Sequence, residues 1–213
     1  HSGYTATKHQ DENDEEEAVA SPAREAPLAE DFLSLRAGAR LSAAGAASTV
    51  SVAVHALTRK AYAIKAVAKA ALDGRGVESL AAEVAILRSA RGSRHVVSLL
   101  ATYQDPNFGY LLFDLAAAGD LMDAMLGAGV LNPDRSRLAC AGVALALEHV
   151  HCSSIVHRDV KPENVLVGLD GSAKLADFGL AAFLQRGDRL STICGTAPFL
   201  APEMLRGSYD HAV

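Results

Sequence analysis

The stretch IVHRDVKPENVLV, residues 155–167, places charged and amide side chains between two short apolar runs. Apolar β-branched runs are typical of buried strands, yet charged and amide groups cannot be buried cheaply without partners. Pro162 interrupts any regular helix or strand ladder in the middle of the stretch. The sequence therefore predicts a rigid loop between two short buried strands. The loop presents to a ligand the side chains of His157, Arg158, Asp159, Lys161, Glu163 and Asn164.

Other short motifs that could carry chemistry precede and follow this loop. In chain order they are AIK (63–65), Glu83 in the segment ESLAAEVAILRSA, the loop itself, DFG (177–179) and APE (201–203). A single DFG or HRD triplet occurs by chance and indicates little. Their joint occurrence in this order, each on a suitable predicted element, indicates one functional site.

Strand patterns dominate residues 32–110. TVSVAV places Val50, Val52 and Val54 on one face of a strand, and KAYAIKAV places Lys65 on the face opposite Ile64. A helix is predicted over residues 78–90, where the spacing of Leu80, Glu83 and Leu87 puts these three on one face. Two more apolar strands are predicted, near VVSLLATY and YLLFDL.

Helical patterns follow. One helix is predicted over residues 121–126, and a longer one begins with Asn132 as its N-cap and Pro133 at its first position. A turn at LDGS and a strand at AKLADF come after the polar loop. The fold class is therefore α+β. We predict a disordered acidic tail (1–31), a strand-rich N-lobe with one helix (32–113), and a hinge with an incomplete helix-rich C-lobe (114–213).

Composition excludes several classes of function. The net charge of −5, from 25 acidic and 20 basic residues, does not favour nucleic-acid binding. Cys140, Cys152 and Cys194 form no close pair, which favours a reducing compartment, cytoplasmic or nuclear. No apolar run is long enough to cross a bilayer. The chain begins without an initiator Met or a signal-peptide pattern, so we expect a fragment or a processed product.

The ordered motifs resemble those of the eukaryotic protein kinase family over roughly residues 35–213. Lys161 and the stretch CGTAPFLAPE are similar to the serine/threonine type, closest to the calcium/calmodulin-dependent or cyclic-nucleotide-dependent groups. The resemblance implies a two-lobed fold, ATP and Mg²⁺ as cofactors, and phosphorylation of serine or threonine on protein substrates. It also implies that Gly179 lets the backbone turn after Asp177.

The resemblance implies a role for each matching residue. Asp159 is expected to orient the substrate hydroxyl and accept its proton, because phosphoryl transfer requires mainly positioning and charge stabilisation. Lys65 is expected to contact the α- and β-phosphates and to pair with Glu83. Asn164 and Asp177 are oxygen ligands of the kind that Mg²⁺ prefers.

Three further contacts are implied within the loop and the segment after it. Thr196 is expected to bond to Asp159 and to Lys161. We count Lys161 among the catalytic residues. His157 is expected to be structural and to pack near Phe178.

The phosphate-covering loop departs from the family pattern. The expected G-x-G-x-x-G-x-V falls on AAGAASTV, where Ala43 and Ser48 replace the outer glycines and Gly45 remains. Glycine lets the backbone approach phosphates closely, so we expect weaker ATP binding, not its loss. The residues expected to bind nucleotide are Ala43, Gly45, Ser48, Val50, Ala63, Lys65, Asp114, Ala116, Asp120 and Leu166.

Regulation and substrate choice can also be read from the resemblance. Thr192 lies where related kinases carry an activating phosphate added by an upstream kinase, and Arg158 is the cation expected to receive it. Asp120 and Glu163 match positions that receive a basic residue upstream of the target serine or threonine. Asp120 could instead bond the ATP ribose, and the phosphate could fall on Ser191.

Two alternatives stay open at this point. The first is a pseudokinase, a nucleotide-binding or scaffolding module disabled at the glycine loop. The second is an inactive fragment, because the sequence stops where the family continues into a long central helix that covers the 138–150 helix. Exposed apolar area of that kind is a liability for folding.

Overall fold

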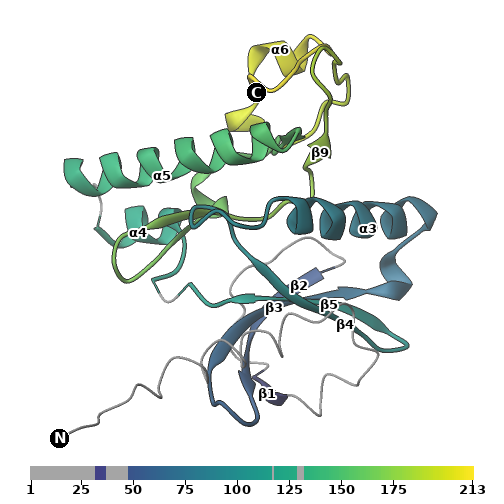
Figure 1. Cartoon of the computed structure of the whole chain (residues 1–213), viewed down its shortest axis with the longest axis vertical. Coiled ribbons are helices and arrows are strands. Elements are labelled where there is room, and N and C mark those ends of the chain that lie inside the picture. The colour runs from purple at the N-terminus through teal and green to yellow at the C-terminus, as the bar shows by residue number, and fades with distance from the viewer. Residues whose placement is uncertain (1–31, 37–47, 117, 129–131) are drawn as a thin grey trace, which may run out of the picture. The chain divides into compact units, whose positions relative to one another are not determined.

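A computed structural model describes residues 32–36, 48–116, 118–128 and 132–213 (Figure 1). The chain divides into two compact units, each described by itself below. The first contains the described residues up to 70 together with 100–113, and the second contains 71–99 with 114–213. The predicted boundary after residue 113 coincides with a boundary between units, but the predicted N-lobe helix groups with the second unit. The predicted tail, Ala43 and Gly45 lie outside the described residues.

The first unit is built on a five-stranded sheet in the order β1-β2-β3-β5-β4. Its strands are β1 (Phe32–Arg36), β2 (Ser48–His55), β3 (Ala61–Ala68), β4 (Leu99–Gln104) and β5 (Phe108–Asp114), and η1 (Lys69–Ala71) is a single 3₁₀ turn. β2 and β3 pair in antiparallel register, with Val50 opposite Lys65 and Val52 opposite Ala63. Residues directly opposite each other in such a pair share a face, so these four side chains project from one side of the sheet.

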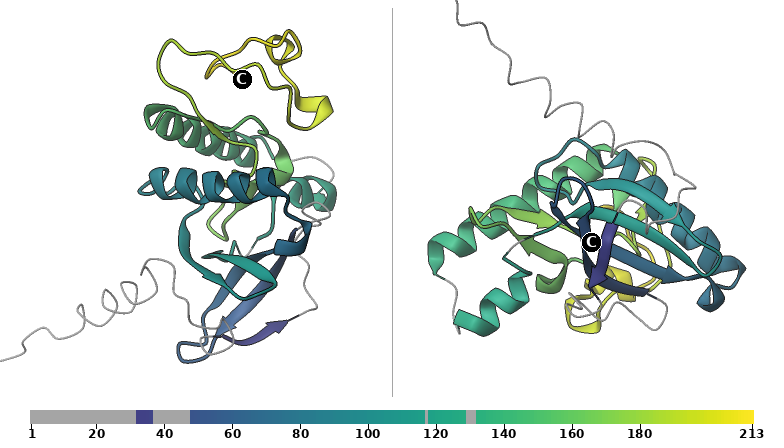
Figure 2. Two further views of the ribbon diagram at one scale, coloured as in Figure 1. Left: turned by 90° about the vertical axis from the view of Figure 1, so that its right-hand side faces the viewer. Right: turned by 90° about the horizontal axis from the view of Figure 1, so that it is seen from below.

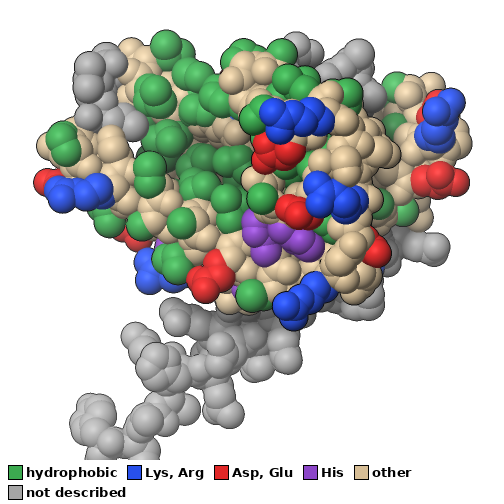
Figure 3. Space-filling view, turned by 90° about the horizontal axis from the view of Figure 1, so that it is seen from above, with side chains coloured by type: hydrophobic (Ala, Val, Ile, Leu, Met, Phe, Trp, Pro, Cys, Tyr) green, Lys and Arg blue, Asp and Glu red, His purple; other side chains and the backbone are tan. Residues whose placement is uncertain are grey.

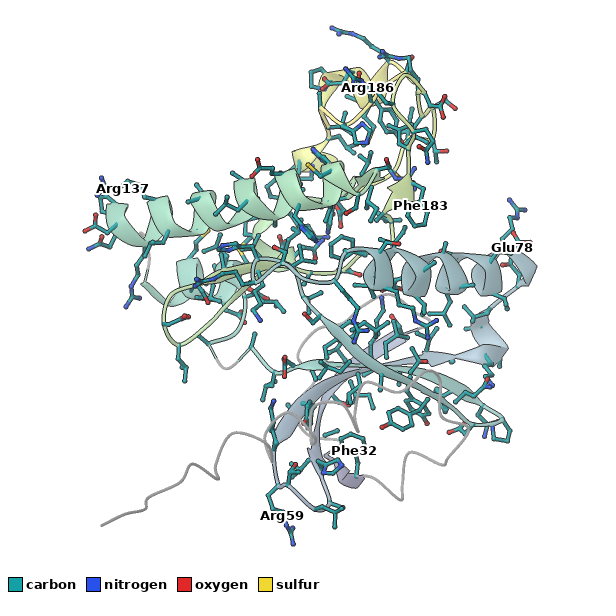
Figure 4. The ribbon with its side chains drawn as sticks, viewed as in Figure 1. Phe32, Arg59, Glu78, Arg137, Phe183 and Arg186 are labelled. Carbon is teal, nitrogen blue, oxygen red and sulfur yellow. The ribbon has the colours of Figure 1, made fainter. Side chains whose placement is uncertain are left out.

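The other face of this sheet carries the core of the unit. Ala53 and Ile64 are fully buried there. Phe32, labelled in Figure 4, packs edge-on against the rings of Tyr62 and Tyr103, with centroids 6.0 and 6.1 Å apart. The side chains on the face that carries Val50 and Lys65 are only half-buried. The core therefore lies on the opposite face of the sheet and leaves the face of Lys65 accessible.

The second unit holds the helices. They are α3 (Gly74–Ser89), α4 (Leu121–Ala128), α5 (Pro133–Cys152) and the short α6 (Pro202–Leu205), with 3₁₀ turns η2 (Pro162–Asn164) and η3 (Ala197–Phe199). α3 and α5 lie side by side (Figure 2), and the His149 side chain on α5 hydrogen-bonds to the carbonyl of Ala90, which caps α3, at 3.0 Å. As predicted, Asn132 caps α5 by accepting a hydrogen bond from the backbone N–H of Asp134.

Two small antiparallel sheets lie next to α5. They pair β6 (Ile155–Val156) with β9 (Ala182–Phe183), and β7 (Val165–Val167) with β8 (Ala173–Leu175). A Cβ added at Gly142 would meet the Cβ of Ala173 at 2.9 Å, so glycine is required where α5 packs on β8. These sheets anchor both ends of the polar loop between β6 and β7.

Among the described residues, none of the helices combines the length and apolar character that crossing a membrane requires.

Candidate active site

The polar loop joins β6 to β7, as the sequence predicts. Ile155 and Val156 before it are fully buried, and the η2 turn ends it with Pro162 at its first position. Asp159 and Asn164 are 8 % and 5 % exposed, although charged and amide side chains usually lie at the surface. Such burial requires hydrogen-bond partners, and the loop supplies them.

Asp159 is the centre of a hydrogen-bond cluster. Its Oδ1 accepts from the backbone N–H and the hydroxyl of Thr196, at 2.9 and 2.8 Å. Its Oδ2 accepts from the Asn164 side chain at 3.0 Å and forms an ion pair with the Lys161 ammonium at 2.9 Å. The Lys161 ammonium also donates to the Thr196 hydroxyl at 2.7 Å. The predicted bonds of Thr196 to Asp159 and to Lys161 are confirmed.

This cluster determines the charge of Asp159. Burial alone would raise the pKa of the carboxyl, but the hydrogen bonds from Lys161 and Thr196 hold its pKa below the ordinary value. Asp159 is therefore a carboxylate at neutral pH. A carboxylate held on both oxygens has a fixed direction, which is what positioning of a hydroxyl requires.

Gly195 brings Thr196 to the loop. Its φ is +104°, and a Cβ at this position would lie 2.7 Å from the carbonyl oxygen of Arg158. Only glycine combines this backbone conformation with so close an approach. The structure thus explains the glycine of the CGT triplet: its conformation brings the Thr196 hydroxyl within hydrogen-bonding distance of Asp159.

His157 is structural, as predicted. It is fully buried, its Nε2–H donates to the carbonyl of Ala176 at 2.9 Å, and its ring packs against Phe178 with centroids 4.8 Å apart. Burial lowers the pKa of His157, and the neutral ring accepts the Asp159 backbone N–H through Nδ1 at 3.3 Å. His157 therefore links the loop to the segment that contains Phe178.

The two predicted metal ligands belong to the two segments that this contact joins: Asn164 to the polar loop, and Asp177 to the position before Phe178. The amide nitrogen of Asn164 donates to both Oδ2 and the carbonyl of Asp159, so its amide oxygen is the atom available to a cation. Asp177 is exposed and has φ +58°. Gly179 lies in the turn that follows Asp177, as expected: the backbone N–H of Ala181 donates to the carbonyl of Phe178 at 3.0 Å, and the positive φ belongs to Asp177 itself. Within the described ranges, no group of three or more His, Cys, Asp or Glu is arranged to hold a metal ion.

The predicted nucleotide-binding residues fall into both units. Ser48, Val50, Ala63 and Lys65 lie on β2 and β3 of the first unit, with Val50 directly opposite Lys65. Glu83 is buried on α3 of the second unit, in the stripe that also buries Ile86 and Leu87. The predicted Lys65–Glu83 pair would join two units that are described separately, and it stays a prediction.

The remaining predicted nucleotide residues lie in the second unit. Asp114 and Ala116 are half-buried at and just after the end of β5. Asp120 and Leu166 form an antiparallel bridge, which brings these two predicted residues together. Burial raises the pKa of Asp120, and Asp123 and Glu163 act in the same direction by repulsion, while backbone N–H groups oppose them.

Tyr209 is a residue that sequence reasoning missed. Its ring is fully buried, its hydroxyl donates to the carbonyl of Thr192 at 2.5 Å and accepts from the Arg158 guanidinium at 3.3 Å. Arg158 also donates to the carbonyl of Leu180 at 2.7 Å. Tyr209 therefore connects the predicted regulatory pair, whose Thr192 side chain is exposed. A lone tyrosine in GSYDHAV gives no periodic signal of this contact.

Comparisons with known proteins agree with this geometry. The sequence profile described as protein kinase domain matches residues 43–213. The chain is 33 % identical over 173 residues to the phosphorylase b kinase gamma catalytic chain, liver/testis isoform, of Mus musculus. The aligned region covers 78 % of this chain and 42 % of that protein.

Two other relatives lead to the same family. The serine/threonine-protein kinase RAD53 of Saccharomyces cerevisiae is 33 % identical over 76 % of this chain and 20 % of its own length. The serine/threonine-protein kinase SIK2 of Gallus gallus is 32 % identical over 91 % of this chain and 24 % of its own length. The chain spans less than half the length of each of these relatives. With the family profile covering most of the sequence, the chain belongs to the protein kinase domain family.

Proposed function

We propose that this protein transfers the γ-phosphoryl group of ATP to serine or threonine hydroxyls of protein substrates. The observation that carries the proposal is the carboxylate of Asp159, buried and held by Lys161, Thr196 and Asn164. In the transfer, the bond between the γ-phosphorus and the bridging oxygen of ADP breaks while the substrate oxygen bonds to that phosphorus. The hydroxyl proton passes to Asp159.

Each held group has a part in this chemistry. Lys161 neutralises charge near the transferring phosphoryl group and keeps Asp159 ionised, because its ammonium is 2.9 Å from Oδ2. Lys65, half-buried on the accessible sheet face, supplies a charge for the phosphates, and Val50 and Ala63 on that face supply an apolar surface for the base. Glu83 is assigned to hold Lys65.

The donor set also fits Mg²⁺. This ion prefers one or two carboxylate or amide oxygens together with substrate phosphates, and it does not need a cage of several protein ligands. Asn164 and Asp177 supply such oxygens, and the Asn164 amide is already oriented by Asp159. When bound, the ion would neutralise charge on the phosphates.

The central test is Asp159→Asn. The amide cannot accept the hydroxyl proton, so we expect label transfer from ATP to a generic protein substrate to fall by about 10²- to 10⁴-fold, while the ATP dissociation constant stays nearly constant. Asp170→Asn is the matched control, because Asp170 is an exposed carboxylate in the β7–β8 turn that bonds to Ser172. Full transfer by the Asp159 variant would reject the assignment. ATP binding without transfer in the parent would instead favour one of the two alternatives, a pseudokinase or an inactive fragment.

We also propose that substrates carry a basic residue upstream of the target. Burial raises the pKa of Asp120, and repulsion from Asp123 and Glu163 acts in the same direction, so a cation beside Asp120 would relieve this repulsion. Peptide-array profiling tests this proposal: a preference for acidic or proline-directed sites would contradict it. We further propose that an upstream kinase activates the protein by phosphorylating Thr192, and that Arg158 is the cation that receives the phosphate. We also propose that the protein is located in the cytoplasm or nucleus.

A further inference from the structure

A pair of histidine side chains lies apart from the Asp159 site, at the end of α5. The rings of His151 and His211 meet edge to face, with centroids 5.3 Å apart. Both border a surface cavity of about 660 Å³. Figure 3 shows histidine side chains gathered between basic and acidic groups on this face, and Figure 4 places Arg186 beside the C-terminal segment. The charged or titratable neighbours that line the cavity are Cys152, Arg186, Asp188, Arg189 and Asp210.

The two half-buried rings meet with no polar partner from the described residues at their buried edges. The Nε2 atoms of both His151 and His211 are buried and have no hydrogen-bond partner in the described part of the chain. Two imidazoles can pack in this way only while they are neutral, because a charge on either ring would be poorly solvated and would repel a charge on the other. Burial and the neighbouring His211 lower the pKa of His151, which agrees with the geometry.

His211 belongs to a segment that holds other parts of the unit. We call residues 208–211 the C-terminal latch. Tyr209 pairs with Leu190 through two backbone hydrogen bonds of 2.9 and 3.0 Å, and its hydroxyl contacts Arg158 and the Thr192 carbonyl. Arg189 donates to the hydroxyl and carbonyl of Ser208 at 2.7 and 3.0 Å. The latch therefore fixes residues 189–192 next to the polar loop.

We propose that the His151–His211 contact is a pH-sensitive switch: acidification charges the His151 imidazole, opens its contact with His211 and releases the latch from residues 189–192 and from Arg158. The ionisation is a simple protonation of the His151 imidazole by solvent. The switch stands on the contact alone, and its consequence for turnover rests on the proposed function. Release would remove one partner of Arg158 and expose the Thr192 backbone, so it would alter the segment proposed to be controlled by phosphorylation.

A metal site fits these residues less well. In the part of the chain that the structure describes, no three His, Cys, Asp or Glu side chains are arranged around one point, so the two rings lack the third protein ligand that structural and catalytic zinc sites have. Arg186 and Arg189 at the same cavity disfavour a cation further. Asp210 could stabilise a charged ring, but it lies 3.7 Å from Arg189 and accepts from the Ala212 N–H.

The direction of the pH effect follows from the sign of the shift. A histidine whose pKa is lower in the closed state is favoured there as the neutral ring. Its contribution to the closed state is complete above the ordinary value of 6.5 and is lost as pH falls below that value. For each unit by which the pKa of a ring is lower in the closed state than in the open state, acidification shifts the equilibrium towards the open state by up to about tenfold.

Hydrogen exchange of the whole chain at pH 7.5 and 5.5, corrected for the intrinsic rates, tests the switch without any need for catalysis. In the parent, protection of peptides from 186–213 should fall by about five- to tenfold at pH 5.5. His211→Gln and His151→Gln should reduce this pH response to less than about threefold, because the first removes the ring that packs on His151 and the second removes the titrating ring itself. His55→Gln, in the other unit, is the matched control and should keep the parent's response.

Two results would overturn the proposal. One is protection of 186–213 in the parent that is the same at both pH values. The other is a response that persists in both glutamine variants. If the variants do not fold, NMR titration of the parent's rings decides: a pKa of His151 at or above 6.5 contradicts a neutral closed contact, and a lower value supports it. Loss of all kinase activity would leave these readouts intact, so the two proposals can fail separately.

Discussion

Thr196→Val tests whether the Asp159 cluster positions the catalytic base. The hydroxyl of Thr196 donates to Asp159 Oδ1 at 2.8 Å and accepts from the Lys161 ammonium at 2.7 Å. Valine has nearly the same shape and removes both bonds. Asp159 keeps the backbone N–H of residue 196 on Oδ1 and Lys161 on Oδ2, at 2.9 Å each. The variant therefore weakens the cluster without dismantling it.

The expected size of the effect follows from the bonds lost. A hydrogen bond to a charged group contributes about 1.5–3 kcal/mol, and the surviving contacts limit the loss to roughly one such bond. If the loss acts on the transition state, kcat falls by about 10- to 100-fold, since each 1.4 kcal/mol or so is tenfold. The KM for ATP should change little, because Thr196 is not assigned to the nucleotide.

The same substitution has a pH signature. Thr196 helps to hold the pKa of Asp159 below its ordinary value, so removing the hydroxyl should move the acidic limb of the kcat profile to higher pH. Thr196→Ser keeps a hydroxyl and should restore both the rate and the limb. The assay is steady-state phosphate transfer with a protein substrate at several pH values. A lowered melting temperature with unchanged kcat and an unshifted limb would show that Thr196 only stabilises the fold.

Three other substitutions test the nucleotide, regulatory and substrate assignments. Ala43→Gly combined with Ser48→Gly should tighten ATP binding measured by calorimetry, because glycine lets the backbone approach the phosphates; an unchanged dissociation constant would refute the assumed alignment of this loop. Thr192→Ala should prevent activation by an upstream kinase in an activity assay, and activation as full as the parent's would exclude Thr192 as the regulated residue. Glu163→Gln should lower the preference for an upstream arginine by about 2- to 5-fold in peptide arrays, as expected for one exposed charge of the kind found in surface ion pairs. An unaltered preference would leave Asp120 as the recognising carboxylate.

Much of the fold could be predicted because local signals agree with tertiary packing. The α+β class of the protein kinase fold is confirmed by the family profile, and Asn132 and Pro133 begin α5 as predicted. The helix predicted from residue 78 begins earlier, at Gly74. The glycines in the first turn of this helix have low helix propensity, so the sequence pattern did not indicate that turn. The Asp73 side chain accepts a hydrogen bond from the Gly76 N–H and caps the helix. A cap of this kind outweighs the poor helix propensity of glycine.

The candidate site was predictable where one residue type carries the chemistry, and unpredictable where a contact joins distant segments. The Thr196–Asp159 bond followed from the family resemblance, although the two residues are 37 positions apart. Tyr209 had no such guide. Its contact with Arg158 joins residues 51 positions apart, and only the tertiary fold places them together. The positive φ of Asp177 likewise had no signal in the sequence, since glycine is the usual residue in that conformation.

The burial of the polar loop supports the role proposed for Asp159, because it removes a competing proton acceptor. His157 lies two residues from Asp159 and is the loop's other group that could accept a proton near neutral pH. Its Nε2–H is used by the Ala176 carbonyl and its Nδ1 by the Asp159 N–H, so neither nitrogen is available to a substrate. Because burial lowers the pKa of His157, charging this ring costs the folded state stability as pH falls below about 6.5, and the link to Phe178 weakens with it. In the proposed transfer, the substrate hydroxyl would therefore meet one proton acceptor in the loop, a carboxylate whose direction is set by Thr196, Asn164 and Lys161.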